Sequence, residues 1–142
     1  MSPISVARDR LERAGSLAAV LDAAYDAFGS MLSAIRAHED PATALFIPLV
    51  MAAASAAEGR NALSFAPALP SRSVPAAPTG DEPADATSVQ AFAASLAALS
   101  ELLAARLTDA ARGASGSGDQ AACRDAARSA RDIHALLTGN GP

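Results

Sequence analysis

The chain has 142 residues, a formal net charge of −4 (15 acidic residues against 11 basic) and 51% hydrophobic residues. This length fits one domain, and the acidic balance argues against general binding to nucleic acid. Every basic residue is arginine, which excludes lysine chemistry such as Schiff bases. The single cysteine, Cys123, excludes an intrachain disulfide and a thiolate metal cluster, and we expect it to be a small buried side chain.

Alanine supplies most of the hydrophobic residues, and aromatic residues make up only 4%. Alanine favours helices but buries little area, so a thin core makes self-association a way to cover more apolar surface. The alanine excess, together with the absence of lysine, resembles the composition bias of a GC-rich bacterial genome, so we expect a bacterial protein. The N-terminal stretch is charged at Arg8, Asp9 and Arg10 where a signal peptide would be apolar, so we expect a cytoplasmic protein.

Apolar residues recur at spacings of three and four in the first part of the chain. They are Ile4, Ala7, Leu11, Ala14, Ala18, Leu21, Tyr25, Phe28, Leu32 and Ile35. This periodicity predicts one long helix over 4–38 with a face given to packing. A break at Gly15-Ser16 is the alternative. Gly15 and Gly29 fall on one side of the expected helix, where they could mark close approach of a neighbour.

A second helix is expected over 41–60, with Asp40 as its cap and Pro41 in its first turn. No charged residue occurs from Pro41 to Ala57. The stretch is shorter than the ~20 residues of a membrane span, so we expect a helix surrounded by others and no stable membrane insertion. Pro48 predicts a kink in its middle.

An apolar pocket is predicted beside this kink, since the side chains of the first helix grow from Ala7 to Phe28. Its candidate lining is Tyr25, Phe28, Leu32, Phe46, Pro48 and Met51. Ordinary core packing around a bent helix is the alternative, and the sequence favours it over a pocket.

Residues 64–85 hold five prolines among small polar residues, the composition of an extended, poorly ordered linker. Such a linker can span a bundle, so the flanking helices are either antiparallel neighbours or joined by a crossover.

The last two helices are expected over 87–112 and 119–138, separated by a glycine-rich turn. On the outer side of the last helix, Arg124, Arg128 and Arg131 could hold a phosphate or carboxylate. Asp125 and Asp132 favour a self-paired, solvated face instead. The predicted fold is therefore all-α: a single domain over 1–142, a four-helix bundle made of two αα-hairpins joined by the proline-rich linker.

The polar candidates for chemistry are His38, Glu39, Asp40 and His134. They form no catalytic motif, and the helices carry no Glu-x-x-His pair for a metal, so we predict no catalytic site, no metal and no cofactor.

Two short segments resemble phosphorelay motifs. His38-Glu39-Asp40-Pro41 resembles the His-Glu-x-x-x-Pro box of histidine kinase dimerisation domains, although two residues are missing before the proline. His134-Ala135-Leu136-Leu137 resembles the His-x-Leu-Lys-Gly box of histidine phosphotransfer domains, with Leu137 in place of the lysine. These resemblances imply a phosphorylated histidine.

Our prediction is a non-catalytic interaction protein, a helical bundle that forms a homodimer or binds another helical protein through its alanine- and leucine-rich faces. The first alternative is a protein that binds a small molecule in the pocket at Pro48. The second alternative is a phosphorelay-like histidine protein.

Overall fold

The computed structural model describes residues 3–38, 44–70 and 89–139. Within these ranges the chain is all-α, as predicted, and holds five helices. They are α1 (Pro3–Arg13), α2 (Leu17–Ala37), α3 (Phe46–Ser64), α4 (Val89–Gly113) and α5 (Ser117–Thr138). The expected count of four is wrong, because the stretch predicted as one helix over 4–38 forms both α1 and α2.

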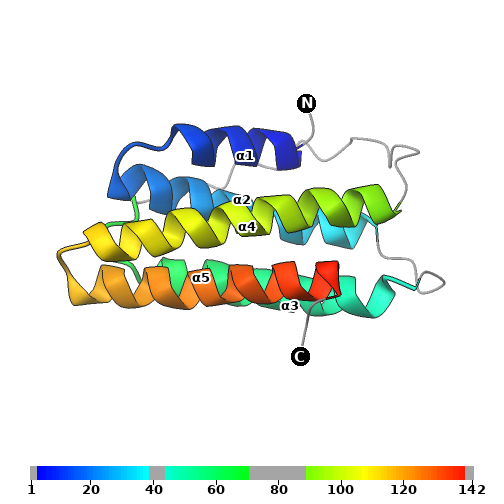
Figure 1. Cartoon of the computed structure of the whole chain (residues 1–142). Helices are drawn as coiled ribbons and strands as arrows, with labels where there is room; N and C mark the ends of the chain where they lie inside the picture. Colours follow the sequence, from blue (N-terminus) through cyan, green and yellow to red (C-terminus); the bar gives the residue numbers. More distant parts are fainter. Residues whose placement is uncertain (1–2, 39–43, 71–88, 140–142) are drawn as a thin grey trace.

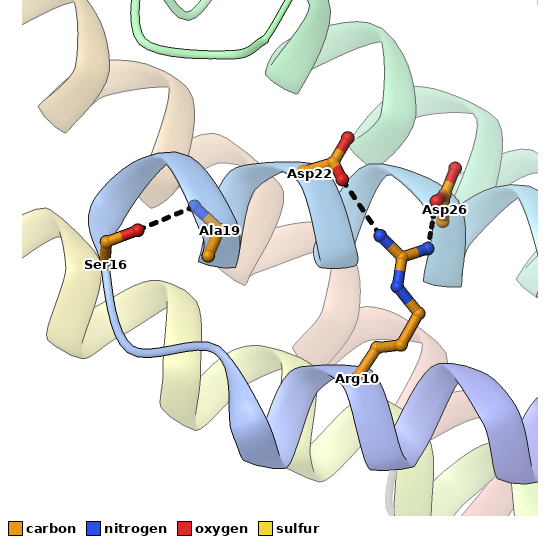
Figure 2. A network of polar contacts seen from close by, with 5 residues as sticks. All are labelled: Arg10, Ser16, Ala19, Asp22 and Asp26. Atoms are coloured by element: carbon orange, nitrogen blue, oxygen red, sulfur yellow. Dashed lines mark hydrogen bonds and ion pairs between the residues drawn. The ribbon is translucent and has the colours of Figure 1, made fainter.

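The break between α1 and α2 lies at the glycine-serine pair. Ser16 has an extended backbone, and its hydroxyl accepts a hydrogen bond from the N–H of Ala19 at 3.2 Å (Figure 2). This N-cap starts a new helix, and Gly15 before it favours no particular backbone conformation. α1 therefore folds back beside α2 (Figure 1). This break is the alternative that the sequence allowed. The apolar spacing favoured one continuous helix because part of the stripe is buried in each helix: Ile4, Ala7 and Leu11 in α1, and Leu21, Phe28 and Ile35 in α2.

Polar contacts fix α1 in its place. The guanidinium of Arg10 reaches from α1 to the carboxylates of Asp22, at 2.9 Å, and Asp26 on α2 (Figure 2). Arg106 on α4 donates a hydrogen bond to the carbonyl of Ala14, just past the end of α1. The last carbonyls of a helix have no partner within the helix, so this bond satisfies a group that the break leaves open.

The four longer helices contact one another in a cycle, α2 with α3, α3 with α5, α5 with α4 and α4 with α2, and α1 lies against α2 and α4 (Figure 1). His38 at the end of α2 stacks on Phe92 near the start of α4, so these two helices are antiparallel. The N–H of Ala68, after α3, bonds to Asp119 at the start of α5. Since α4 and α5 form a hairpin, α3 and α4 run in the same direction. This is the crossover arrangement of the two that the sequence allowed.

The second predicted helix differs from the observed one at both ends. α3 begins at Phe46, so Pro48 lies in its first turn, where a missing N–H disrupts no earlier turn. The predicted kink is therefore wrong. At the other end, α3 continues to Ser64, and Ala66 is buried in the following turn instead of forming part of an extended linker. Residues 71–85 of the predicted linker, like Asp40 and Pro41, lie outside the described residues.

The core is built from apolar stripes on α4 and α5 together with buried residues of α1, α2 and α3. The buried members of those stripes are Phe92, Leu96, Leu99, Leu103 and Leu107 on α4, and Ala122, Ala126, Ala130 and Ile133 on α5. The predicted pairing of two glycines with a close neighbour is wrong. A Cβ on Gly15 would have no atom within 4 Å, and one on Gly29 would meet only side-chain atoms of Arg60 at 3.8 Å, whereas Gly59 on α3 lies in much closer contact with a neighbour.

Candidate functional site

The inner face of α3 is densely packed. Its buried residues are Leu49, Ala52, Ala56, Gly59 and Leu63, again at spacings of three and four. A Cβ built on Gly59 would lie 2.6 Å from Cζ of Phe28, so the ring on α2 fits only because this position has no side chain. Small residues along this face thus let α3 lie close to its neighbours, and its place in the bundle is well determined.

The outer face of α3 is exposed and apolar. Ile47, Met51 and Val50 have 61%, 51% and 39% of their surface exposed, and Ala54 lies exposed one turn further on. We call these four residues the outer row. Because 18 residues make five helical turns, Phe65, which is 75% exposed, lies at the same angle as Ile47 at the far end of the helix. Glu58 and Asn61 lie between the outer row and Phe65.

The expectation that this uncharged helix is surrounded is therefore wrong. A helix that is apolar all round gives no polar stripe to show which side faces water. A signal was nevertheless present in residue size. Ala52, Ala56 and Gly59, at spacings of four and three, are the small residues that close packing needs, whereas the large side chains Ile47 and Met51 fall on the opposite side. Side-chain volume would have indicated the inner face where polarity could not.

The six residues of the predicted pocket are not brought together around one cavity. Phe28 is fully buried against Gly59, and Met51 faces solvent on the outer row. Tyr25 lies half-buried beneath the guanidinium of Arg60, 4.7 Å from its ring centre. Leu32, Phe46 and Pro48 are half-buried. Neither of the two cavities described below has any of these residues in its lining.

An apolar cavity does lie near the start of α3, between α4 and α5. Its volume is about 390 Å³, and it is lined by Leu45, Gln90, Ala93, Ala94, Ala97, Leu137 and Thr138. Only a glutamine and a threonine provide polar groups. The cavity therefore suits an apolar ligand, as the predicted pocket did, but it is built from different residues.

The two histidines, His38 and His134, contact different residues. The Nδ1 of His38 lies 2.9 Å from the carbonyl of Ala34, so this nitrogen is the protonated donor, and the ring stacks on Phe92 with centres 4.1 Å apart. His134 lies 3.9 Å from Glu101 on α4, at the solvent-exposed side of the bundle. Glu39 and Asp40 fall outside the described residues, so their position relative to His38 stays a prediction.

Cys123 is fully buried on α5, as predicted. Burial, together with the nearby carboxylate of Asp119, raises the pKa of this thiol to about 11. The thiolate is the reactive form, so the side chain is chemically inert at neutral pH. Within the described ranges no three His, Cys, Asp or Glu residues gather as metal ligands would.

α4 is the single described helix that is long and apolar enough, by length and composition, to cross a membrane. In the bundle, 44% of its most apolar window is buried, and core helices of globular proteins meet the same criteria. Glu101, Asp109 and Arg112 also lie exposed along it.

No known protein family, no curated protein and no solved structure matches this chain.

Proposed function

We propose that this protein is a non-catalytic interaction protein that self-associates through the outer row of α3. The observation that carries this proposal is the exposure of Ile47, Val50 and Met51 side by side on one helix face. Single exposed apolar residues are normal on a protein surface, but a contiguous row is typical of an interaction site. Phe65 extends the same face toward the other end of α3.

A second copy of the chain is the occupant that suits the chemistry of this face. The net charge of −4 makes two copies repel at a distance, yet no charged residue lies on α3 before Glu58. A twofold axis near Met51 would therefore pair the two outer rows without bringing like charges together, with Ile47 of one copy beside Ala54 of the other. Ala54, which has a small side chain, allows the two helices to approach closely.

The size of the face sets the expected strength. α3 has 19 residues and is about 28 Å long, so its outer face covers about 300 Å². A stable interface buries about 800 Å² on each partner. We therefore expect a weak, concentration-dependent dimer, with neighbouring residues of α2 or α5 adding the remaining contact.

Sedimentation velocity and native mass spectrometry over a wide concentration range test this proposal. The wild-type protein is expected to shift from monomer to dimer as concentration rises. Met51→Glu places two like charges beside the axis, and Ile47→Glu places a charge against the apolar Ala54 of the other copy, so each is expected to abolish the dimer. Val6→Glu is the matched control, since Val6 on α1 is 43% exposed and remote from α3, and it should dimerise as the wild type does.

Thermal denaturation should show that both outer-row variants fold, because their side chains already face water. A wild-type protein that stays monomeric at the highest concentration contradicts the proposal. So does a dimer that survives Met51→Glu and Ile47→Glu.

The apolar cavity beside Leu45 supports a second candidate, binding of a small apolar molecule. Its volume of about 390 Å³ falls within the range of about 300–1,000 Å³ usual for ligand pockets. Indole is a suitable neutral probe, and its binding should shift the amide signals of Ala93 and Ala97. Ala94→Trp is expected to fill the cavity and block binding, whereas Ala98→Trp, on an exposed position of α4 outside the lining, should not. Equal binding by both variants would rule out this site.

A further inference from the structure

A second cavity lies in the groove between α4 and α5, towards the turn that joins them. Its volume is about 240 Å³, and its lining consists of Thr108, Ala111, Arg112, Arg124, Ala127 and Arg131. Ala111 and Ala127 are buried and form the floor of the cavity. Their side chains are single methyl groups, so the space above them stays open. The three arginines come from both helices and border this floor.

Helix geometry explains why these arginines meet. Arg124, Ala127 and Arg131 are spaced by three and four residues on α5, so they share the side of the helix that faces α4. Arg112 lies one turn after Thr108 on the antiparallel helix. Arg128 lies on the same helix as Arg124 and Arg131 but is not part of the lining.

The positive charge of the groove is largely uncompensated. Arg112 lies 3.7 Å from Asp109, but both side chains are mostly exposed, so this pair is weak. Neither Arg124 nor Arg131 forms an ion pair with any residue in the described part of the chain, and no carboxylate belongs to the lining. The predicted pairing of these arginines with Asp125 and Asp132 is therefore not found. Three arginine residues therefore line one small concavity on a chain of negative net charge.

We infer that this groove binds the phosphate group of a small molecule. Guanidinium groups hold phosphate oxygens through paired N–H donors, and several arginines around one concavity match a compact dianion. The hydroxyl of Thr108 already donates to the carbonyl of Ala104 at 2.7 Å, so the arginines supply the donors. The acidic remainder of the protein repels an extended polyanion, which favours a small phosphorylated ligand over nucleic acid.

A titration with inorganic phosphate tests this inference. Amide signals of the ¹⁵N-labelled protein are followed at constant ionic strength, kept with sodium chloride so that screening does not change. Saturable shifts are expected at Ala111 and Ala127. Arg124→Gln and Arg131→Gln should each weaken binding on the order of tenfold, since each removes a charged donor. Arg128→Gln makes the same charge change on the same helix outside the lining, and it should bind phosphate within about twofold of the wild type.

Two further arms identify the ligand. If glycerol phosphate binds more tightly than inorganic phosphate, the ligand of the groove is a phosphorylated small molecule. If the two bind equally, the ligand is free phosphate. Acetate that binds as tightly as phosphate overturns the assignment to phosphate. If Arg128→Gln weakens phosphate binding as much as Arg124→Gln does, the binding reflects the general surface charge of α5 and the inferred site is wrong. Amide shifts that never saturate also overturn the inference. Thermal denaturation of each variant shows that the fold is kept.

Discussion

α3 and α4 have similar inner faces but different outer faces. Both bury leucine and alanine at helical spacing against α2 and α5. On the outside, α4 presents alanine with Ser95, Glu101 and Asp109, whereas α3 presents Ile47 and Met51. The fold needs only the inner faces, so the apolar outer face of α3 serves no purpose in packing the monomer. This difference is the reason why we propose that self-association uses the outer face of α3 and not that of α4.

Leucine-to-alanine changes on the inner faces should produce the largest effects. Leu49→Ala on α3 and Leu99→Ala on α4 each leave a cavity in the core, with an expected loss of about 2–5 kcal/mol in the free energy of unfolding. Met51→Ala, on the outer row, should change it by less than about 0.5 kcal/mol. Urea denaturation at low protein concentration, where the monomer predominates, measures all three. A large effect of Met51→Ala would show that the outer row packs within the monomer.

The next largest effect should come from the bond that joins the end of α3 to α5. Oδ1 of Asp119 accepts a hydrogen bond from the N–H of Ala68 at 2.9 Å, and Asp119 is buried. Asp119→Ala leaves this N–H without a partner, at an expected cost of about 1–3 kcal/mol. Asp119→Asn keeps an oxygen acceptor and should lose less. Asp125→Ala, on the exposed side of the same helix, is the control and should stay within about 0.5 kcal/mol of the wild type in urea denaturation.

Substitution of Gly59 tests how closely α3 approaches α2. Gly59→Ala places a methyl group against the ring of Phe28, and the overpacking should outweigh the gain in helix propensity, for a net loss of about 1 kcal/mol. Gly29→Ala is the matched control, because its nearest neighbours are side-chain atoms of Arg60 at 3.8 Å, an ordinary contact. It should stabilise the protein by up to about 1 kcal/mol. Thermal unfolding midpoints that rise for both variants would show that the ring has room.

The sequence predicted the fold best where apolar and polar residues fall on opposite sides of a helix. The helices predicted over 87–112 and 119–138 agree with α4 and α5 to within about two residues, because charged residues mark their solvent side. Around α3 the same rule failed, since Ala, Ile and Met give no such contrast. The prediction of one continuous helix over 4–38 failed for another reason. The apolar register continues through it, so only the cap at Ser16 distinguishes two helices from one.

The candidate sites were predicted less well than the fold. The sequence allows an anion site at Arg124, Arg128 and Arg131 but favours a self-paired face. In the structure Arg128 lies outside the groove, and Arg112 of α4 lines it because the hairpin packs antiparallel. The sequence predicts that the second helix is surrounded by others, but the outer row is exposed. Burial of a helix face depends on which other helices pack against it. The number of helices around α3 depends on the whole topology, which local pattern does not specify.

The smallest effect is expected on the polar outer face of α4. Arg112 and Asp109 are 78% and 70% exposed, so Arg112→Gln should change the free energy of unfolding by less than about 0.5 kcal/mol in a phosphate-free buffer. High salt should reduce even that difference. A loss above about 1 kcal/mol would mean that the outer face of α4 supports the fold, contrary to the comparison with α3. In phosphate buffer a bound ligand adds stability that grows with the logarithm of one plus the ratio of ligand concentration to Kd, so the wild type, which binds more tightly, should gain more than Arg112→Gln does. The same variant thus separates a weak surface ion pair from a ligand contact.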